Sequence, residues 1–291
     1  MVRDRSVSAK VFEAVVHIVM VCVVLLTLLP VIHVISISFS SAAAISRGDV
    51  GLWPVEFSVS AYTAIFKSGN VPRSFLNSVY YTALGTAINM LLTTMMAYPL
   101  SRTYLTFRKF YNVLVLITMF FSGGLIPTFL TVKSLGLYNT VWAIVLPGAI
   151  STWNLIIMRT FFMGLPAELE ESAQLDGAND FTIFARIILP LSKASIATIA
   201  LFYGVGHWNN WFSGMIYFKN SKSYPLQTIL RSIVINSEVS DEITVDEVIN
   251  SISAEGIKYS TLVVSMVPMM AVYPFIQKYF VKGIMIGSLK G

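Results

Sequence analysis

Six long apolar stretches, separated by polar segments, constrain this chain more than any other feature. A helix needs about 20 mostly apolar residues to cross the hydrocarbon core of a bilayer. The stretches of that length are residues 14–39, 75–98, 110–132, 139–161, 194–217 and 259–281. Charged residues make up 12% of the chain, about half the share typical of soluble domains. The sequence therefore predicts an all-α integral membrane protein with six transmembrane helices, forming one domain over residues 1–291.

The distribution of Lys and Arg predicts the orientation of these helices. If the N-terminus is inside, the inner segments hold 12 basic residues and the outer segments 8, although the outer segments are longer. The short turn at residues 99–109 alone carries Arg102, Arg108 and Lys109. Since cytoplasmic loops carry an excess of Lys and Arg, we expect both termini to be cytoplasmic. Lys278, near the end of the last stretch, can reach the interface.

Residues 164–193 form the one long segment in the middle of the chain that is both charged and patterned. Pro166 suits the first turn of a helix, and the acidic residues that follow favour a helix N-terminus. Asp176-Gly177 predicts a turn, after which Asn179 or Asp180 can cap a second helix that Pro190 closes. The segment is either an ordinary polar loop or a helix–turn–helix that docks a partner outside the membrane.

The sequence excludes several classes of site. It has no Gly-x-x-x-x-Gly-Lys-Ser/Thr loop for nucleotide phosphates and no block of basic residues for nucleic acid. Its single cysteine, Cys22, excludes a disulfide framework, and its three histidines lack partners at metal-ligand spacing. The centres of the apolar stretches hold no carboxylate, Lys or Arg, whereas ion-coupled carriers usually need such groups. We therefore expect energy to come from a partner.

Two polar segments lie on the predicted outer side. Residues 40–74 include an expected short helix at residues 60–66. Residues 218–258 are acidic but lack the spacing of a calcium loop, which favours a solvated face or a docking surface.

Aromatic and amide residues inside the apolar stretches are candidates for a substrate pathway. Aromatic rings can stack on sugars while amides bond their hydroxyls, although helix packing is the alternative role. The candidates are Phe121, Trp153, Asn154, Trp208, Asn209 and Trp211. Ser122-Gly123-Gly124 beside Phe121 predicts a local break in the third helix, a feature of pathway linings or of close helix packing.

The C-terminus contains spaced glycines, which predict a flexible tail over residues 282–291 rather than a longer helix. A frayed terminus is the simplest interpretation.

Several of these motifs together resemble the permeases of binding-protein-dependent ABC importers. Glu171-Ser172-Ala173, Asp176-Gly177-Ala178 and Leu189-Pro190 are similar to the EAA loop of that family, with Ser172 in place of an alanine. The segments FFSGGLIPTFL, LGLYNTVWAIVLPGAIS and GHWNNWF are similar to carbohydrate permeases of the maltose-transporter superfamily, in particular the second permease of the oligosaccharide and alginate importer branch.

This resemblance implies a type I importer permease in the bacterial inner membrane, paired with a related permease, two ATPase subunits and an extracytoplasmic solute-binding protein. ATP and magnesium would then bind the partners, and this chain would carry no cofactor. The residues implied to couple to the ATPase are Glu170, Glu171, Ala173, Asp176, Gly177, Ala178, Phe181, Leu189 and Pro190. The tail residues implied to reach the ATPase interface are Gly283, Gly287, Lys290 and Gly291.

Two other classes remain open from the residues alone. One is a membrane-embedded enzyme, which would need a nucleophile, an acid pair or a metal set. The other is an ion-coupled secondary carrier.

Overall fold

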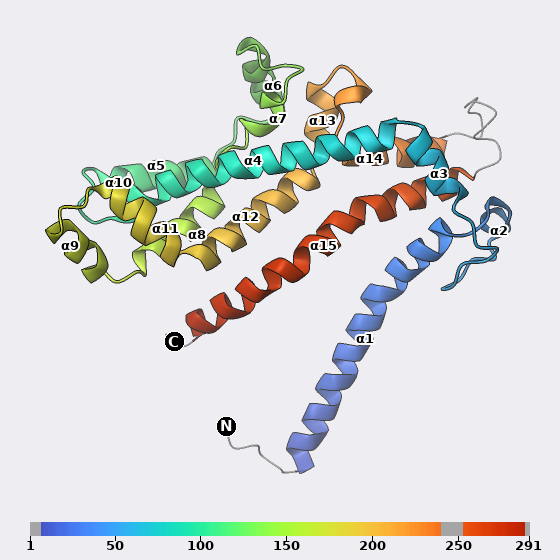
Figure 1. The fold of residues 1–291 in the computed structure, drawn as a ribbon, viewed down its shortest axis with the longest axis horizontal. Coiled ribbons are helices and arrows are strands. Elements are labelled where there is room, and N and C mark those ends of the chain that lie inside the picture. The colour runs from blue at the N-terminus through green and yellow to red at the C-terminus, as the bar shows by residue number, and fades with distance from the viewer. Residues whose placement is uncertain (1–6, 240–252, 289–291) are drawn as a thin grey trace. The chain divides into compact units, whose positions relative to one another are not determined.

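The computed structural model describes residues 7–239 and 253–288, and every regular element among them is a helix (Figure 1). The chain divides into two compact units. Unit 1 comprises Met1–Pro72 and Ser232–Met266, and unit 2 comprises Arg73–Arg231 and Val267–Gly291. The predicted all-α class is therefore confirmed for the described residues.

Unit 1 begins with the helix α1 (Val7–Ser38), which is predominantly apolar and long enough to cross a membrane. The chain then forms α2 (Ala42–Arg47), where the Ser41 side chain accepts a hydrogen bond from the backbone N–H of Ala44, a standard N-cap. Next comes α3 (Ser60–Lys67), which confirms the short helix expected at residues 60–66. Phe39 lies against Phe57 and Tyr62, with ring centroids 5.6 and 4.8 Å apart.

Unit 2 is built along α4 (Asn70–Ser101), a continuous helix of 32 residues that matches the predicted stretch 75–98. The stretch 110–132 is divided into α5 (Arg108–Phe120) and α6 (Leu125–Ser134), which meet at 113°. The predicted break is therefore confirmed, and Gly124 there has φ +81°, a value that glycine adopts without strain.

The stretch 139–161 is not one continuous helix, which corrects the simple sequence expectation. It contains α7 (Trp142–Val145), a non-helical segment, and α8 (Thr152–Met163). Pro147 lacks the N–H that a continuous helix would use, and Ser151 caps the new helix by accepting from the Asn154 N–H. The stretch 194–217 is likewise divided into α12 (Lys193–Trp208) and α13 (Phe212–Tyr217).

After α13 the chain forms a short 3₁₀ turn at Ser221–Ser223 and α14 (Leu226–Val239). Part of the acidic segment predicted at residues 218–258 is thus helical. Its members Asp241, Glu242, Asp246 and Glu247 lie outside the described residues.

The last helix, α15 (Ala254–Ser288), continues through Gly283 and Gly287. The prediction of a flexible tail from residue 282 is therefore wrong for residues 282–288, which are helical. Each glycine costs a helix only about 1 kcal/mol, a cost that a helix of 35 residues tolerates. Lys290 and Gly291 lie outside the described residues.

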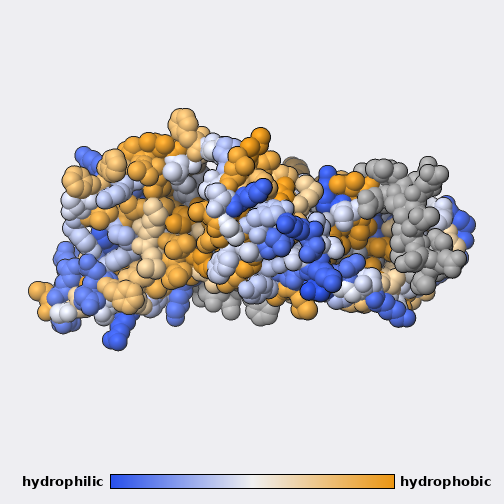
Figure 2. Space-filling model, turned by 90° about the horizontal axis from the view of Figure 1, so that it is seen from above, coloured by the Kyte–Doolittle hydropathy of each residue, from blue (hydrophilic) through white to orange (hydrophobic). Residues whose placement is uncertain are grey.

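Apolar side chains cover much of the face seen in Figure 2. On α1 alone, Phe12 and Leu26 are both 71% exposed, an arrangement expected where lipid is the solvent. Among the described residues, three helices are long and apolar enough to cross a membrane: Ser8–Ser38, Asn70–Ser101 and Ala254–Pro274. Up to five spans result if each bent pair counts as one, namely α5 with α6, and residues Asp180–Leu191 with α12.

Candidate functional site

Residues 164–193 are hereafter called the coupling loop, after the role that the sequence resemblance implies, and their first helix is α9 (Glu168–Leu175). The helix ends in a Schellman motif, in which the Gly177 N–H bonds to the Gln174 carbonyl and the Ala178 N–H to the Ala173 carbonyl. Gly177 has φ +81°, the left-handed conformation that this motif requires. The small side chains of Ala173 and Ala178 both pack against the buried core of unit 2. The Ala-x-x-x-Gly-Ala spacing is thus a requirement of the turn itself.

The second arm of the coupling loop starts at Asn179, whose side chain accepts a hydrogen bond from the Thr182 N–H at 2.8 Å. It continues as α10 (Asp180–Ile183), a π-helical turn (Phe184–Ile188) and α11 (Leu189–Leu191). The π turn lies directly before Pro190, where the proline ring would crowd a regular α-helical ladder. The arm ends at Leu191, as predicted from Pro190, and α12 follows at 82°.

The coupling loop is anchored on one side and exposed on the other. Ile183, Phe184 and Ile188 belong to the same buried cluster as Phe162 of α8. In contrast, Leu175 is 90% exposed and Phe181 71% exposed. Glu171, Asp176 and Pro190 are exposed as well, and Leu189 is partly buried. The loop therefore presents apolar and acidic groups outward from a fixed base.

Glu170 differs from its neighbour Glu171 because it is buried and forms an ion pair with Arg102. Arg102 also donates to the Phe162 carbonyl at 3.1 Å and lies over the Tyr98 ring, 4.9 Å from its centroid. Burial raises the pKa of the Glu170 carboxyl above its ordinary value, an effect that the positive charge of Arg102 opposes.

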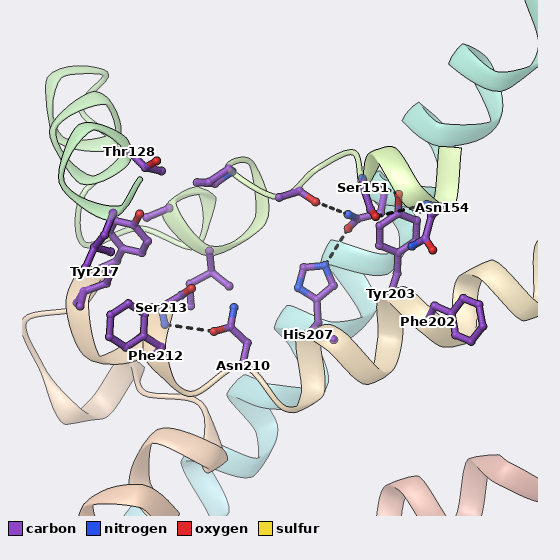
Figure 3. A pocket seen from close by; sticks show the side chains of 18 residues that line it. Thr128, Ser151, Asn154, Phe202, Tyr203, His207, Asn210, Phe212, Ser213 and Tyr217 are labelled. Atoms are coloured by element: carbon purple, nitrogen blue, oxygen red, sulfur yellow. Dashed lines mark hydrogen bonds between the residues drawn. The ribbon is translucent and has the colours of Figure 1, made fainter. Parts of the chain in front are cut away.

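A cavity of about 490 Å³ lies within unit 2 among residues of α4, α6–α8, α12 and α13 (Figure 3). Its size is in the range of small-molecule sites. Its polar lining consists of amide, hydroxyl and imidazole groups: Asn89, Thr128, Ser151, Asn154, Tyr203, His207, Asn210 and Ser213. Its aromatic lining is Phe202, Phe212 and Tyr217. None of the described residues that line it is Asp, Glu, Lys or Arg.

A hydrogen-bond network fixes the wall of this cavity. The Asn89 side chain, which is fully buried, lies 2.8 Å from His207 Nε2 and donates to the Gly148 carbonyl at 2.8 Å. The Tyr203 hydroxyl accepts from the Ser151 N–H at 2.9 Å, as the dashed lines in Figure 3 show. The network thus satisfies polar groups of the non-helical segment between α7 and α8, as buried backbone groups require.

Of the pathway residues predicted from sequence, the structure places Asn154 at the cavity. Phe121 and Trp153 are 77% and 60% exposed and are not among the lining residues. Trp208 is buried against Phe75, with ring centroids 5.8 Å apart.

Asn209 and Trp211 do not line the cavity either. The Trp211 ring lies under the Arg231 guanidinium, 5.3 Å from it.

The sequence analysis did not select Asn89, Tyr203, His207 or Asn210 as pathway residues. A usable signal existed, because Tyr203 and His207 are four residues apart and thus share one face of α12, and Asn210 follows shortly after the helix ends. Gly85 is a second signal. A Cβ at that position would lie 2.5 Å from His207 Nε2, so the absence of a side chain is what admits the imidazole.

Comparison with known proteins gives the family. The family described as "Binding-protein-dependent transport system inner membrane component" matches residues 7–286. The polygalacturonan/rhamnogalacturonan transport system permease protein YtcP of Bacillus subtilis is 44% identical over 283 residues, covering 97% of this chain and 99% of that protein. Protein LplC of the same organism is 44% identical over 267 residues, covering 91% and 90%.

A solved structure, of a bacterial ABC transporter that imports the acidic polysaccharide alginate, contains a chain with the same fold. The TM-score is 0.89 at 33% identity, covering 95% of this chain and 99% of that one. Members of the family are transporter permeases and not enzymes, and they lie in the inner membrane with several spans. Such a permease works with a solute-binding protein, an ATPase and a second permease. This chain belongs to the family of inner membrane components of binding-protein-dependent transport systems.

Proposed function

We propose that this chain is the permease subunit of an ATP-driven importer that moves an oligosaccharide into the bacterial cytoplasm by alternating access. The complex would contain this chain, a related permease, two ATPase subunits and an extracytoplasmic binding protein. The proposal rests on one observation: unit 2 contains both an exposed coupling loop and a polar cavity whose lining carries no charged residue.

Six spans with both termini cytoplasmic are the topology we propose. The three long helices, the bent pair of α5 and α6, and α12 account for five spans, while Asp180–Leu191 belongs to the coupling loop. The sixth comprises the segment that contains α7 and α8, where the cavity network supplies partners for the non-helical backbone. With the N-terminus inside, the coupling loop faces the cytoplasm, which agrees with the bias of Lys and Arg.

The coupling loop would dock in the ATPase. Leu175 and Phe181 are large apolar side chains held in water, which is typical of an interface. Glu171 and Asp176 lie beside them and can pair with basic groups of the partner. The anchored face, built on Ala173, Ala178 and Leu189, would carry ATPase motion into the membrane unit.

The C-terminal residues Gly283, Gly287, Lys290 and Gly291 would contact the same ATPase pair. This contact rests on the family resemblance.

The cavity would hold part of the sugar during passage. Asn154, Asn210 and His207 can exchange hydrogen bonds with hydroxyls while Phe202 and Tyr217 offer ring faces to C–H groups. One relative named above belongs to a polygalacturonan/rhamnogalacturonan transport system, and the structural neighbour belongs to a transporter involved in the import of alginate. We infer that this chain carries an oligosaccharide derived from such a polymer, with cationic groups for any uronate supplied by the second permease.

Co-purification tests this proposal. The tagged chain, extracted gently from its native membrane, should bring with it a related permease and an ATPase with vanadate-sensitive hydrolysis. Hydrolysis should rise when the binding protein is loaded with uronate oligosaccharides and should not rise with neutral hexoses. Recovery of the chain alone, or with copies of itself only, would contradict the importer assignment. Stimulation by neutral sugars alone would contradict the substrate class.

A further inference from the structure

The Arg102 cluster, formed by Arg102, Tyr98, Glu170 and the Phe162 carbonyl, joins three helices at one guanidinium. Arg102 directly follows α4, Phe162 is near the end of α8, and Glu170 lies on α9 of the coupling loop. The guanidinium pairs with Glu170, donates to Phe162 at 3.1 Å, and covers the Tyr98 ring. A planar guanidinium suits this use because its donors point in fixed directions while its face can stack.

The second arm of the coupling loop reaches the same place. Phe184, in the π-helical turn, packs on Tyr98 with ring centroids 5.3 Å apart. Both arms of the loop therefore contact the C-terminal end of α4. The first arm does so through the Glu170–Arg102 ion pair, and the second through the packing of Phe184 on Tyr98. A displacement of the loop must move the end of α4 or break these contacts.

Burial separates this ion pair from ordinary surface pairs. The side chains of Arg102 and Glu170 are each 10% exposed, whereas Arg47 and its partners Asp49 and Glu56 are about half exposed. Exposed pairs contribute little. A buried pair loses much when one partner is removed, because the other charge is left without compensation. The Arg102–Glu170 contact is therefore expected to persist while the loop moves.

The other end of the connection is the cavity. α4 is continuous from Asn89 to Ser101, the residue directly before Arg102, a length of about 18 Å along the helix axis at 1.5 Å per residue. Asn89 bonds to His207 and to the Gly148 carbonyl in the cavity wall. One helix thus contacts the coupling loop at its end and the cavity wall near its middle.

We propose that Arg102 is the positioning residue through which the coupling loop displaces α4, and that α4 carries this displacement to the cavity wall. This inference rests on the proposed coupling function of residues 164–193. It assigns to Arg102 and Glu170 a role in transmission that is separate from docking, since both are buried away from the exposed face of the loop.

The test uses the assembled importer and needs no knowledge of the sugar. The chain has a single cysteine, so Cys22→Ser leaves a background for one probe. Ser213→Cys places a thiol in the cavity, and its rate of maleimide labelling is measured with and without ATP and vanadate. In the parent protein, trapping with ATP and vanadate should change the labelling rate of Cys at this position.

Glu170→Gln keeps the size and the acceptor while removing the charge, and Arg102→Lys keeps the charge without the planar contacts. Both variants should assemble, and without nucleotide their maleimide labelling rate should equal that of the parent. The change in labelling rate caused by ATP and vanadate should be about tenfold smaller than in the parent. The double variant Arg102→Glu/Glu170→Arg, which exchanges the two charges, should restore part of the ATP-induced change in labelling rate. Lys109→Gln, an exposed cation in the same turn, is the matched control and should behave as the parent.

A full ATP-induced change in assembled Glu170→Gln and Arg102→Lys complexes would overturn the inference. A smaller amount of complex with an unaltered change per complex would overturn it too, because that result indicates a stabilising role only. Gly177→Val separates the two proposals. If it abolishes the change while the Arg102 and Glu170 variants do not, docking stands and transmission through Arg102 fails. If none of these variants alters it, the coupling role of the loop fails as well.

Discussion

The coupling loop and the cavity are two regions of the same unit, and their side chains are arranged in opposite ways. The coupling loop turns large apolar side chains such as Leu175 and Phe181 outward on a backbone fixed by local caps. The cavity turns Asn89, His207 and Tyr203 inward, and distant segments of the chain hold them there. In water an outward apolar group indicates a partner. At membrane depth an inward polar group indicates a pathway or a structural network.

This difference shows which structural features determine the geometry of each region. In the loop, the geometry lies in a few backbone positions, so a single change of conformation should disable it. In the cavity, the geometry lies in hydrogen bonds between helices, so polar truncations should act there. The predictions below separate the two regions, beginning with the largest expected effect.

Trp208→Ala should lower the amount of assembled protein rather than the affinity for sugar. The side chain is 4% exposed and packs against Phe75, and truncation of such a buried aromatic costs about 3–5 kcal/mol. Thermal melting of the purified complex measures the loss. Trp153→Ala, at a 60% exposed position, is the matched control and should melt as the parent does. A changed substrate affinity with unchanged stability in Trp208→Ala would restore its role as a pathway residue.

Gly177→Val should uncouple ATP hydrolysis from uptake in a chain that still inserts. Valine at φ +81° is strained by about 2 kcal/mol, which opens the Schellman motif and misplaces the docking face. Uptake per ATP hydrolysed should fall about thirtyfold. Gly177→Asn should lose less, because asparagine tolerates the left-handed region. Equal and normal coupling in both variants would remove the loop from the energy pathway.

Asn89→Ala should weaken transport while basal ATP hydrolysis is kept. The substitution leaves the Gly148 carbonyl and His207 without their partner, a cost of about 1–2 kcal/mol or roughly tenfold in uptake. Uptake at several sugar concentrations shows whether apparent affinity or maximal rate changes. Thr27→Ala, whose hydroxyl bonds only within α1, serves as control. Wild-type uptake by Asn89→Ala would mean that the network does not shape the pathway.

The smallest effect concerns pH. Burial raises the pKa of Glu170 above 4.5, so the folded protein holds this proton more tightly than the unfolded chain does. The resulting stability is complete below the unfolded pKa and is lost as pH rises through the folded one. Glu170→Gln lacks this dependence, so the melting temperature of the parent relative to the variant should fall from pH 4.5 toward neutrality. A constant difference would contradict the assigned burial effect.

Local sequence signals were sufficient for most of the coupling loop. The signals at Asp176-Gly177, Asn179 and Pro190 act within a few residues of themselves, so the turn and the second arm follow from the chain alone. The break at Ser122–Gly124 was predictable for the same reason. Pro166 was predicted in the first turn of the first helix but lies two residues before its start at Glu168.

The cavity and the Arg102 cluster were not predictable in this way. Asn89 meets His207 across 118 positions of sequence, and Arg102 meets the Phe162 carbonyl across 60. Such contacts depend on how helices pack, which periodicity does not encode. Aromatic content alone also does not distinguish positions such as Trp208, which packs as a core residue, from Trp153, which is exposed.

Uptake into liposomes tests the central claim most directly. The purified complex is reconstituted with the loaded binding protein, and internalised sugar and hydrolysed ATP are measured in the same vesicles. The account predicts uptake that requires ATP and the binding protein, stops with vanadate and is lost in Gly177→Val. Uptake driven by an ion gradient without ATP would contradict the account and would assign this chain to the secondary carriers.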